Sequence, residues 1–267
     1  MVQQLNDPMT LSAAEARMLM RTGKWNGITP GAAPGYAQAN LAILPRELAY
    51  DFLLFCVRNP KPCPLLDVTD AGSPVPRVAA PGADLRFDLP RYRVYRHGEL
   101  VDEPLSIEGY WSNDLVAFLL GCSFTFEHGL RDAGIPLRHL QCGGNVPMYR
   151  TTVECRPAGI FHGPLVVSMR PIPAALVATA VQISGRYPSV HGAPVHVGAP
   201  DALGIQSLDR PDWGDPAPIH NGEIPVFWAC GVTPQAVAMA VRPELMITHA
   251  PGHMFVTDIP IPSLAAA

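Results

Sequence analysis

The chain has 267 residues, 48% of them hydrophobic and 16% charged, which is typical of a globular protein and not of a disordered one. A formal net charge of −4 argues against a nucleic-acid partner, because such proteins usually carry a basic surface. No stretch approaches the roughly 20 apolar residues that cross a bilayer, and the N-terminus lacks a basic region followed by an apolar run. We therefore expect a cytoplasmic protein with no signal peptide and no membrane partner.

The first third of the sequence predicts two helices followed by a strand. Ser12-Ala-Ala-Glu15 is a capping box, and it begins a helix that stops at Gly23. Pro45 suits the first turn of a second helix, which Asn59-Pro60 ends. The apolar residues 64–68 then predict a buried strand.

The middle of the sequence predicts a hairpin and then two short helices. Residues 91–96 alternate between arginine and apolar or aromatic side chains, and with residues 99–103 they predict a hairpin at a sheet edge. Helices are expected over 114–120 and 124–132, with a tight link between them.

The remaining sequence predicts a second structural unit. Residues 146–198 have the pattern strand, strand, helix, strand, which indicates a small two-layer α+β subdomain. We expect this subdomain to be inserted into a main domain made of residues 1–145 and 199–267.

A βαβ unit is predicted near the C-terminus. The strand 224–230, the helix 235–241 and the strand 245–249 follow one another, and such units give parallel strands with helices on both faces. We therefore expect an α/β fold whose main domain has three αβα layers around a mixed, partly parallel sheet. Sites in such folds lie at the carboxyl ends of strands.

Two clusters could bind or process a carboxylate. Ser123 lies at a predicted helix start, where free N–H groups bind anions, and Glu127 follows as a possible proton carrier. Ordinary helix capping explains the same residues. Arg150 and Arg170 lie at predicted strand ends, and the guanidinium fork matches a carboxylate, although structural salt bridges are an equally good explanation.

Four histidines occur in two pairs, His191 with His196 and His249 with His253. Each pair spans a bend with proline and glycine, so the spacing is not that of a zinc-binding helix. Structural histidines, acid–base groups and a metal site drawn from both pairs all remain open. Thr233 opens the helix after Cys230, and that cysteine is either an activated thiolate or a core residue.

Several motifs are absent from the sequence. It contains no G-x-x-x-x-G-K-[ST], no G-x-G-x-x-G after a strand and no G-x-S-x-G. Nucleotide-dependent chemistry and serine hydrolase chemistry are therefore disfavoured, and no cofactor or metal is expected.

Seven blocks between about residue 10 and residue 258 resemble the hydro-lyase family that includes D-glutamate cyclases. The resemblance implies a two-part α/β fold and a carbon–oxygen lyase. A D-glutamate cyclase converts D-glutamate to 5-oxo-D-proline and water, and the family supplies no established catalytic residues to carry over. The blocks are FLLFCVRNPKPCPLLD (52–67), DLPRYRVY (88–95), FLLGCSFTFE (118–127), NVPMYRT (145–151), HGAPVH (191–196), VFWACGVTPQ (226–235) and THAPGHMFVTD (248–258).

These observations combine into a hypothesis about a small amino- or hydroxy-dicarboxylic acid. Arg150 and Arg170 hold its carboxylates, and the helix starts near Ser123 and Thr233 stabilise the oxyanion of ring closure. Glu127, together with His249 or His253, takes the amine proton and protonates the departing hydroxyl.

Three other functions fit the same sequence. One is dehydration of a different hydroxy- or amino acid, which would use the same arginines and release an unsaturated product. Another is metal-assisted chemistry at His191, His196, His249 and His253, and the last is a carboxylate-binding protein without catalysis. The sequence also leaves open whether the chain forms a homo-oligomer.

Overall fold

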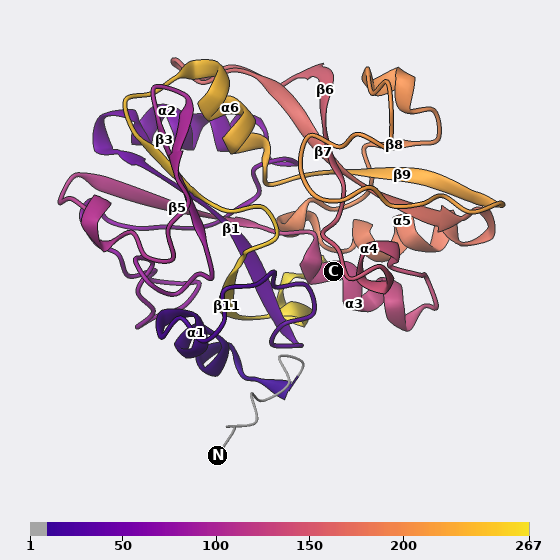
Figure 1. Ribbon diagram of the computed structural model, residues 1–267, viewed down its shortest axis with the longest axis horizontal. Coiled ribbons are helices and arrows are strands. Elements are labelled where there is room, and N and C mark those ends of the chain that lie inside the picture. The colour runs from indigo at the N-terminus through magenta and orange to yellow at the C-terminus, as the bar shows by residue number, and fades with distance from the viewer. Residues whose placement is uncertain (1–9, 267) are drawn as a thin grey trace.

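The computed structural model describes residues 10–266 and has two β-sheets lying side by side (Figure 1). The α/β class is confirmed. Residues 1–9, where no signal peptide was expected, lie outside the described residues. The helices are α1 (Ala13–Arg21), α2 (Arg46–Arg58), α3 (Phe124–Asp132), α4 (Arg138–Gln141), α5 (Val177–Gly185) and α6 (Thr233–Val241). None of these helices is both long and apolar enough to cross a bilayer.

The larger sheet has seven strands and the smaller has four. In spatial order, the larger contains β2 (Leu65–Val68), β5 (Leu115–Gly121), β1 (Tyr36–Pro45), β10 (Met246–His249), β3 (Tyr92–Arg96) and β4 (Glu99–Asp102), and β11 (Phe255–Pro260) also pairs with β1. The smaller contains β6 (Met148–Glu154), β7 (Pro164–Pro173), β9 (Glu223–Ala229) and β8 (His196–Val197).

The expectation of a partly parallel sheet is wrong. Every strand pair within residues 10–266 is antiparallel. The predicted βαβ unit fails because β9 belongs to the smaller sheet and β10 to the larger, so α6 connects two sheets and does not cross over within one. Strand β9 was expected in the main domain, and the structure instead pairs it with β7 and β8. The division into domains itself stays a prediction.

Strand β5 was predicted as a helix, and this was also wrong. All seven of its residues are buried, and it pairs with β1 on one side and β2 on the other. A strand covered on both faces needs apolar residues at every position, so its sequence carries neither the two-residue nor the 3.6-residue period.

Other local predictions are confirmed. The capping box of α1 is present, since Ser12 Oγ accepts a hydrogen bond from Glu15 N at 3.3 Å and Glu15 Oε2 accepts one from Ser12 N at 2.8 Å. Helix α2 ends where Asn59-Pro60 begins. The β3–β4 hairpin forms one edge of the larger sheet, as its alternating arginines indicated.

The main core lies between the two sheets and is filled by both of them. Phe52 and Phe55 of α2 pack with Phe118 of β5, and Val167 and Phe227 enter the same cluster from the smaller sheet. The far face of the smaller sheet is covered by α3 and α5 (Figure 1). The smaller sheet therefore packs against the main core on one face and against α3 and α5 on the other.

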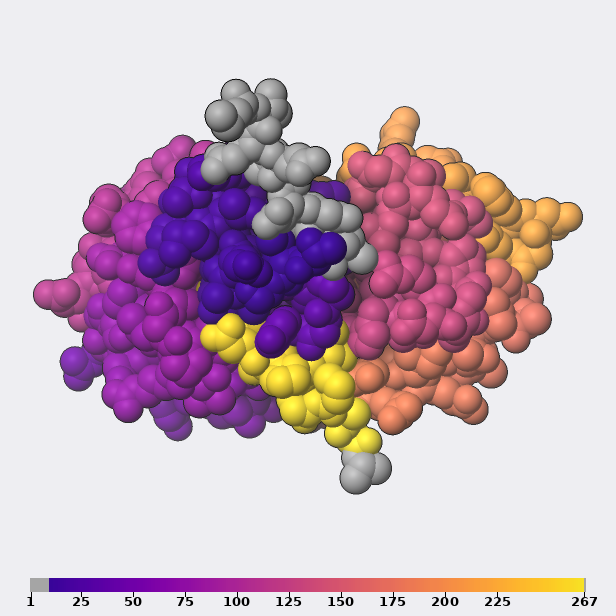
Figure 2. All heavy atoms as spheres, turned by 90° about the horizontal axis from the view of Figure 1, so that it is seen from below, coloured from indigo at the N-terminus to yellow at the C-terminus, as the bar shows by residue number. Residues whose placement is uncertain are grey.

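The two ends of the described chain meet on one face of the larger sheet. Arg17 of α1 donates from Nη1 to the carbonyl oxygen of Val256 at 2.8 Å and forms an ion pair of 2.9 Å with Asp258. Figure 2 shows the indigo N-terminal and yellow C-terminal segments side by side. This contact holds α1 against β11, which pairs with β1.

Replacing Phe52 by alanine tests the aromatic part of this core. The ring is fully buried and lies edge-on to Phe118 and Phe161, at centroid distances of 4.9 and 5.2 Å. We expect the free energy of unfolding to fall by about 3–5 kcal/mol, as for other Phe→Ala changes in cores, measured by urea denaturation. Tyr50→Ala is the matched control on α2, because that side chain is 74% exposed, and a similar loss there would contradict the assignment of the core.

Candidate functional site

A fully buried guanidinium lies between α3 and the smaller sheet. Arg170 of β7 donates from Nε to Glu127 Oε1 at 2.8 Å, and its Nη2 forms an ion pair with the same oxygen. Nη2 also donates to Ser123 Oγ at 3.0 Å and Nη1 to Ser168 Oγ at 3.1 Å. The rings of Phe126 and Trp228 lie 5.7 and 5.4 Å from the guanidinium carbon. We call Arg170, Glu127, Ser123 and Ser168 the buried ion cluster.

Glu127 is held in its ionised form by this cluster. Burial alone raises the pKa of the carboxyl group, but the charges of His139 and Arg170 outweigh burial and lower the pKa to about 2. The His139 Nε2 atom lies 3.3 Å from Glu127 Oε1. The carboxylate is therefore charged and already paired at neutral pH, which fits a structural anchor better than a proton carrier.

A hollow lies next to the loop between β10 and β11. Its volume is about 550 Å³, and we call it the His253 cavity. Charged and polar side chains from five separate segments converge on it. The lining residues are Ile28, Arg91, Arg93, Glu103, Asn145, Asp212, Trp213, Gly214, Asp215, Ala250, Pro251 and His253.

The two arginines of the cavity differ in their partners. Arg93 Nε donates to Glu103 Oε1 at 2.7 Å, so its charge is neutralised. The guanidinium of Arg91 has no ion pair or hydrogen bond to another side chain within residues 10–266. Its backbone is fixed, because its carbonyl oxygen accepts from Ala250 N at 3.0 Å. Arg91 thus presents an unpaired positive charge to a cavity of substrate size.

His253 provides a neutral imidazole in the same cavity. Burial lowers the pKa of this histidine, the Pro251 carbonyl opposes that effect, and the charge of Arg91 lowers the pKa further. The Nδ1 atom lies 3.0 Å from the Pro251 carbonyl oxygen. In the tautomer with its proton on Nδ1, the ring donates to that oxygen and the lone pair lies on Nε2.

Asn145 is held in the cavity wall by its backbone. Its N–H donates to Asp215 Oδ2 at 2.8 Å, and its carbonyl oxygen accepts from Asp215 N at 3.1 Å. Its side-chain amide lies against Gly252, which has a φ of +82° and where an added Cβ would be 2.6 Å from the amide nitrogen. Glycine at 252 therefore serves both the turn and the close approach of this amide.

Arg150 is not part of the His253 cavity lining and, within residues 10–266, shares no side-chain partner with Arg170. It is exposed, its guanidinium carbon lies 5.1 Å from the centroid of the Trp213 ring, and its Nε is 3.8 Å from Asp212 Oδ1. It lines a separate hollow of about 280 Å³, and Asp212 belongs to the walls of both hollows. The structure does not bring Arg150 and Arg170 together as one clamp.

His249 and Thr233 are buried and are not among the residues that line the cavity. Burial lowers the pKa of His249 to about 3, and its Nδ1 accepts from Leu41 N at 3.1 Å. Thr233 Oγ1 donates to the Cys230 carbonyl oxygen at 2.7 Å and accepts from Val166 N at 3.1 Å, which ties α6 to β7. Cys230 is itself buried, and burial raises the pKa of its thiol to about 11.

The four predicted histidines do not form one group. His191 Nδ1 lies 2.6 Å from the Lys61 carbonyl oxygen, and His196 Nε2 lies 2.8 Å from that of Ala199. In the part of the chain that the structure describes, no three or more His, Cys, Asp or Glu side chains are placed to hold a metal ion.

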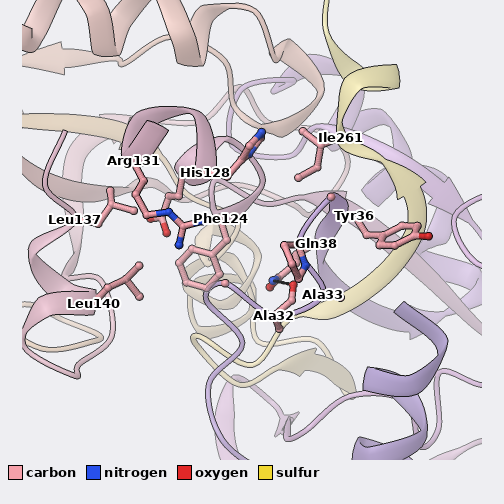
Figure 3. A pocket seen from close by; sticks show the side chains of 14 residues that line it. Ala32, Ala33, Tyr36, Gln38, Phe124, His128, Arg131, Leu137, Leu140 and Ile261 are labelled. Atoms are coloured by element: carbon pink, nitrogen blue, oxygen red, sulfur yellow. Dashed lines mark hydrogen bonds between the residues drawn. The ribbon is translucent and has the colours of Figure 1, made fainter. Parts of the chain in front are cut away.

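A third, much smaller pocket opens beside α3. Its volume is about 40 Å³, which suits a water molecule and not a dicarboxylic acid. Figure 3 shows Phe124 and Gln38 facing each other across it, with Arg131 nearby on α3 and Tyr36 pointing away.

Arg91 and Asn145 were not among the site residues predicted from the sequence. Arg91 and Arg93 were interpreted as edge residues, although their two-residue spacing puts both side chains on one face of the strand. The register of β3 against β10 pairs Arg93 with Thr248, which brings that face to the His253 loop. Asn145 begins one of the blocks on which the family resemblance depends, and this was the available signal for it.

Glu127→Gln tests the buried ion cluster. Removing one charge of a buried pair leaves the other without its partner, so we expect the free energy of unfolding at pH 7 to fall by about 3–5 kcal/mol. Because the folded pKa is depressed, the wild type should lose this contribution as the pH falls from about 4.5 towards about 2.

The measurement is urea denaturation at a series of pH values. The variant should show a shallower loss of stability with acid than the wild type. Glu154→Gln, at an exposed position, is the control and should keep the wild-type slope. Equal slopes for wild type and Glu127→Gln would contradict the role of the pair.

Comparison with known proteins places the chain in a family. A family model described as D-glutamate cyclase matches residues 116–258. A solved structure of a nitrogen repressor-like protein from Methanococcus jannaschii covers 88% of this chain and 91% of its own at 10% identity, and its TM-score of 0.37 is too low to indicate a shared fold.

Curated relatives match nearly the whole chain. A "Putative hydro-lyase" of Stutzerimonas stutzeri is 65% identical over 249 residues, covering 93% of this chain and 94% of the relative. "Putative hydro-lyase YcsI" of Bacillus subtilis is 59% identical over 255 residues, covering 96% and 99%. A "Putative hydro-lyase" of Rubrobacter xylanophilus is 66% identical over 246 residues, covering 92% and 95%. The chain therefore belongs to the hydro-lyase family that the D-glutamate cyclase model describes.

Proposed function

We propose that this protein is a hydro-lyase that cyclises D-glutamate to 5-oxo-D-proline with release of water, and that the reaction takes place in the His253 cavity. The family supports the reaction class and the substrate. The observation that carries the choice of site is the unpaired guanidinium of Arg91 beside a neutral imidazole, in a hollow of about 550 Å³.

Arg91 is the group that binds the α-carboxylate of the substrate. Its guanidinium can donate two parallel hydrogen bonds to a carboxylate, and such charge-assisted bonds are stronger than neutral ones. Arg93 remains paired with Glu103, so it contributes to the shape of the cavity more than to its charge. Asp212 also lines the cavity, and its carboxylate accepts from Arg150 N at 2.8 Å and lies 3.8 Å from Arg150 Nε.

His253 moves protons in the proposed reaction. The substrate ammonium gives up a proton to Nε2, and its nitrogen attacks the side-chain carboxyl carbon. The C–N bond forms, a C–O bond breaks, and the departing oxygen leaves as water with the two protons that the nitrogen has lost. Holding the two ends of one molecule together supplies much of the acceleration.

Proton transfer is placed on His253 and not on Glu127 or His249. Glu127 is already bound by Arg170, and His249 is buried with its Nδ1 bound to Leu41 N. Ser123 and Thr233 likewise bond within the fold, to Arg170 and Val166. In this proposal these four residues support the site without touching the substrate.

Arg91→Ala is expected to raise the KM for D-glutamate about 10- to 100-fold, because the substrate carboxylate loses its charged hydrogen-bonding partner. Conversion of D-glutamate is followed by proton NMR, which also distinguishes binding alone from formation of a lactam or of an unsaturated product. Arg96→Ala, at an exposed arginine that ends β3, the strand directly after Arg91, is the control and should leave KM unchanged. Wild-type protein that binds D-glutamate and never converts it would refute the proposed function and favour a carboxylate-binding protein.

The pH dependence of kcat/KM should identify His253. Its imidazole is active when neutral, so activity is lost as the pH falls through its pKa, and burial places that pKa below the usual 6.5. We expect an acid limb with a midpoint under pH 6.5. His253→Gln should lower kcat about 10²- to 10⁴-fold and remove that limb. An unchanged acid limb in the variant would assign the proton transfer to another group.

A further inference from the structure

One carboxylate oxygen of Glu103 is available to a ligand in the His253 cavity. Its Oε1 accepts from Arg93 Nε at 2.7 Å, whereas its Oε2 accepts no hydrogen bond within residues 10–266. The Glu103 side chain lines the cavity and is 37% exposed, so a molecule in the cavity can reach the carboxylate. Arg93 therefore fixes the carboxylate in one orientation and leaves part of its acceptor capacity unused.

The β3–β4 hairpin puts Glu103 on the same face as Arg91. Its register pairs Val94 with Asp102, which places Arg93 opposite Glu103, and backbone bonds continue the ladder beyond this pair. Arg91 comes two residues before Arg93, so the two arginines share a face. Diagonal neighbours on one face of such a ladder lie about 7–8 Å apart. A cation and an anion thus flank a space that suits the head group of an amino acid.

Both of these charges act on His253. Burial has the largest effect on the pKa of this imidazole and lowers it, and the Pro251 carbonyl raises it. Beyond these effects, the charge of Arg91 lowers the pKa and the charge of Glu103 raises it. Glu103 therefore lies within electrostatic reach of the group that takes the amine proton in the proposed reaction.

The lining contains two other carboxylates, Asp212 and Asp215, on a different segment. Each accepts a hydrogen bond from a backbone N–H at 2.8 Å, so each is tied to the loop that carries it. Glu103 instead shares a strand face with Arg91, which binds the α-carboxylate in the proposed reaction. Since the ammonium and the α-carboxylate of an amino acid are attached to the same carbon, the partner of the ammonium must lie close to Arg91.

We infer that Glu103 binds the substrate ammonium through Oε2, and that this contact selects α-amino diacids over diacids without an amine. The inference rests on the proposed cyclisation in this cavity. A hydrogen bond between an ammonium and a carboxylate is about twice as strong as one between neutral groups. Glu103 is a specificity residue in this scheme, because it holds the ammonium beside His253 and transfers no proton itself.

The test uses two ligands that differ only in the amine. D-2-Amino-4-phosphonobutyrate has a phosphonate in place of the side-chain carboxyl group of D-glutamate, so it keeps the ammonium and cannot close to the lactam. 4-Phosphonobutyrate is the same molecule without the amine. Both are titrated by calorimetry into the wild type, Glu103→Gln, Asp212→Asn and Glu99→Gln. We expect the wild type to bind the amino ligand about 10- to 100-fold more tightly, the range for a hydrogen bond between charged groups.

In Glu103→Gln the preference should fall to about threefold or less. The variant should bind 4-phosphonobutyrate as well as the wild type does or better, because Arg93 loses its internal partner. A damaged fold would instead weaken both ligands together, and thermal unfolding checks for it. Glu99→Gln is the matched control on the same hairpin, because its carboxylate is 76% exposed, lies 3.4 Å from Arg242 and is not part of the cavity lining. It should keep the full preference.

Two results would overturn the inference and leave the proposed function standing. One is a wild type that converts D-glutamate but shows no preference for the amino ligand, a comparison that needs no variant. The other is a preference that persists in Glu103→Gln, or that Asp212→Asn loses to the same extent, since the cause would then be another carboxylate or the net charge of the cavity. Wild-type protein that neither converts D-glutamate nor binds either ligand overturns both.

Discussion

The Arg170–Glu127 pair is the interaction on which the arrangement of the two sheets depends. Arg170 belongs to the smaller sheet, and Glu127 lies on α3, which directly follows β5 of the larger sheet. Removing both charges from water is expensive, so the contact is favourable only with its complete set of partners. Ser123, Ser168 and two aromatic rings complete that set. The geometry that satisfies the guanidinium therefore also fixes where α3 begins.

Charge pairing separates the structural arginines from the candidate ligand-binding arginine. Arg17, Arg93 and Arg170 each have a carboxylate partner within the fold. Arg91 has none, although its backbone is held in the sheet and its side chain lines the cavity. An unpaired cation costs little where water reaches it, and it retains its full attraction for an anion.

Sequence patterns identified the elements whose signals are local. The capping box of α1, helix α2 and the β3–β4 hairpin depend on neighbouring residues and were predicted correctly. Strand β5 was not, because its apolar run becomes a strand only through pairing on both sides. Residue type suggested that Arg150 and Arg170 bind anions, but the partners of an arginine are set by distant segments. His253 was found through its loop, and its neighbours Arg91 and Asn145 became apparent only from the strand register.

Residues 146–229 form a contiguous segment that contains all four strands of the smaller sheet, so this stretch looks like a unit that could be excised. The buried ion cluster prevents it. A fragment of these residues would keep Arg170 and Trp228 but lose Glu127, Ser123 and Phe126, which lie on the other side of the cut. The Arg170 guanidinium of the fragment would then be exposed to water on the side that the missing residues now cover. The smaller sheet thus depends on the preceding residues for electrostatic reasons as well as for packing, and gene fusion or shuffling would have to carry α3 along with it.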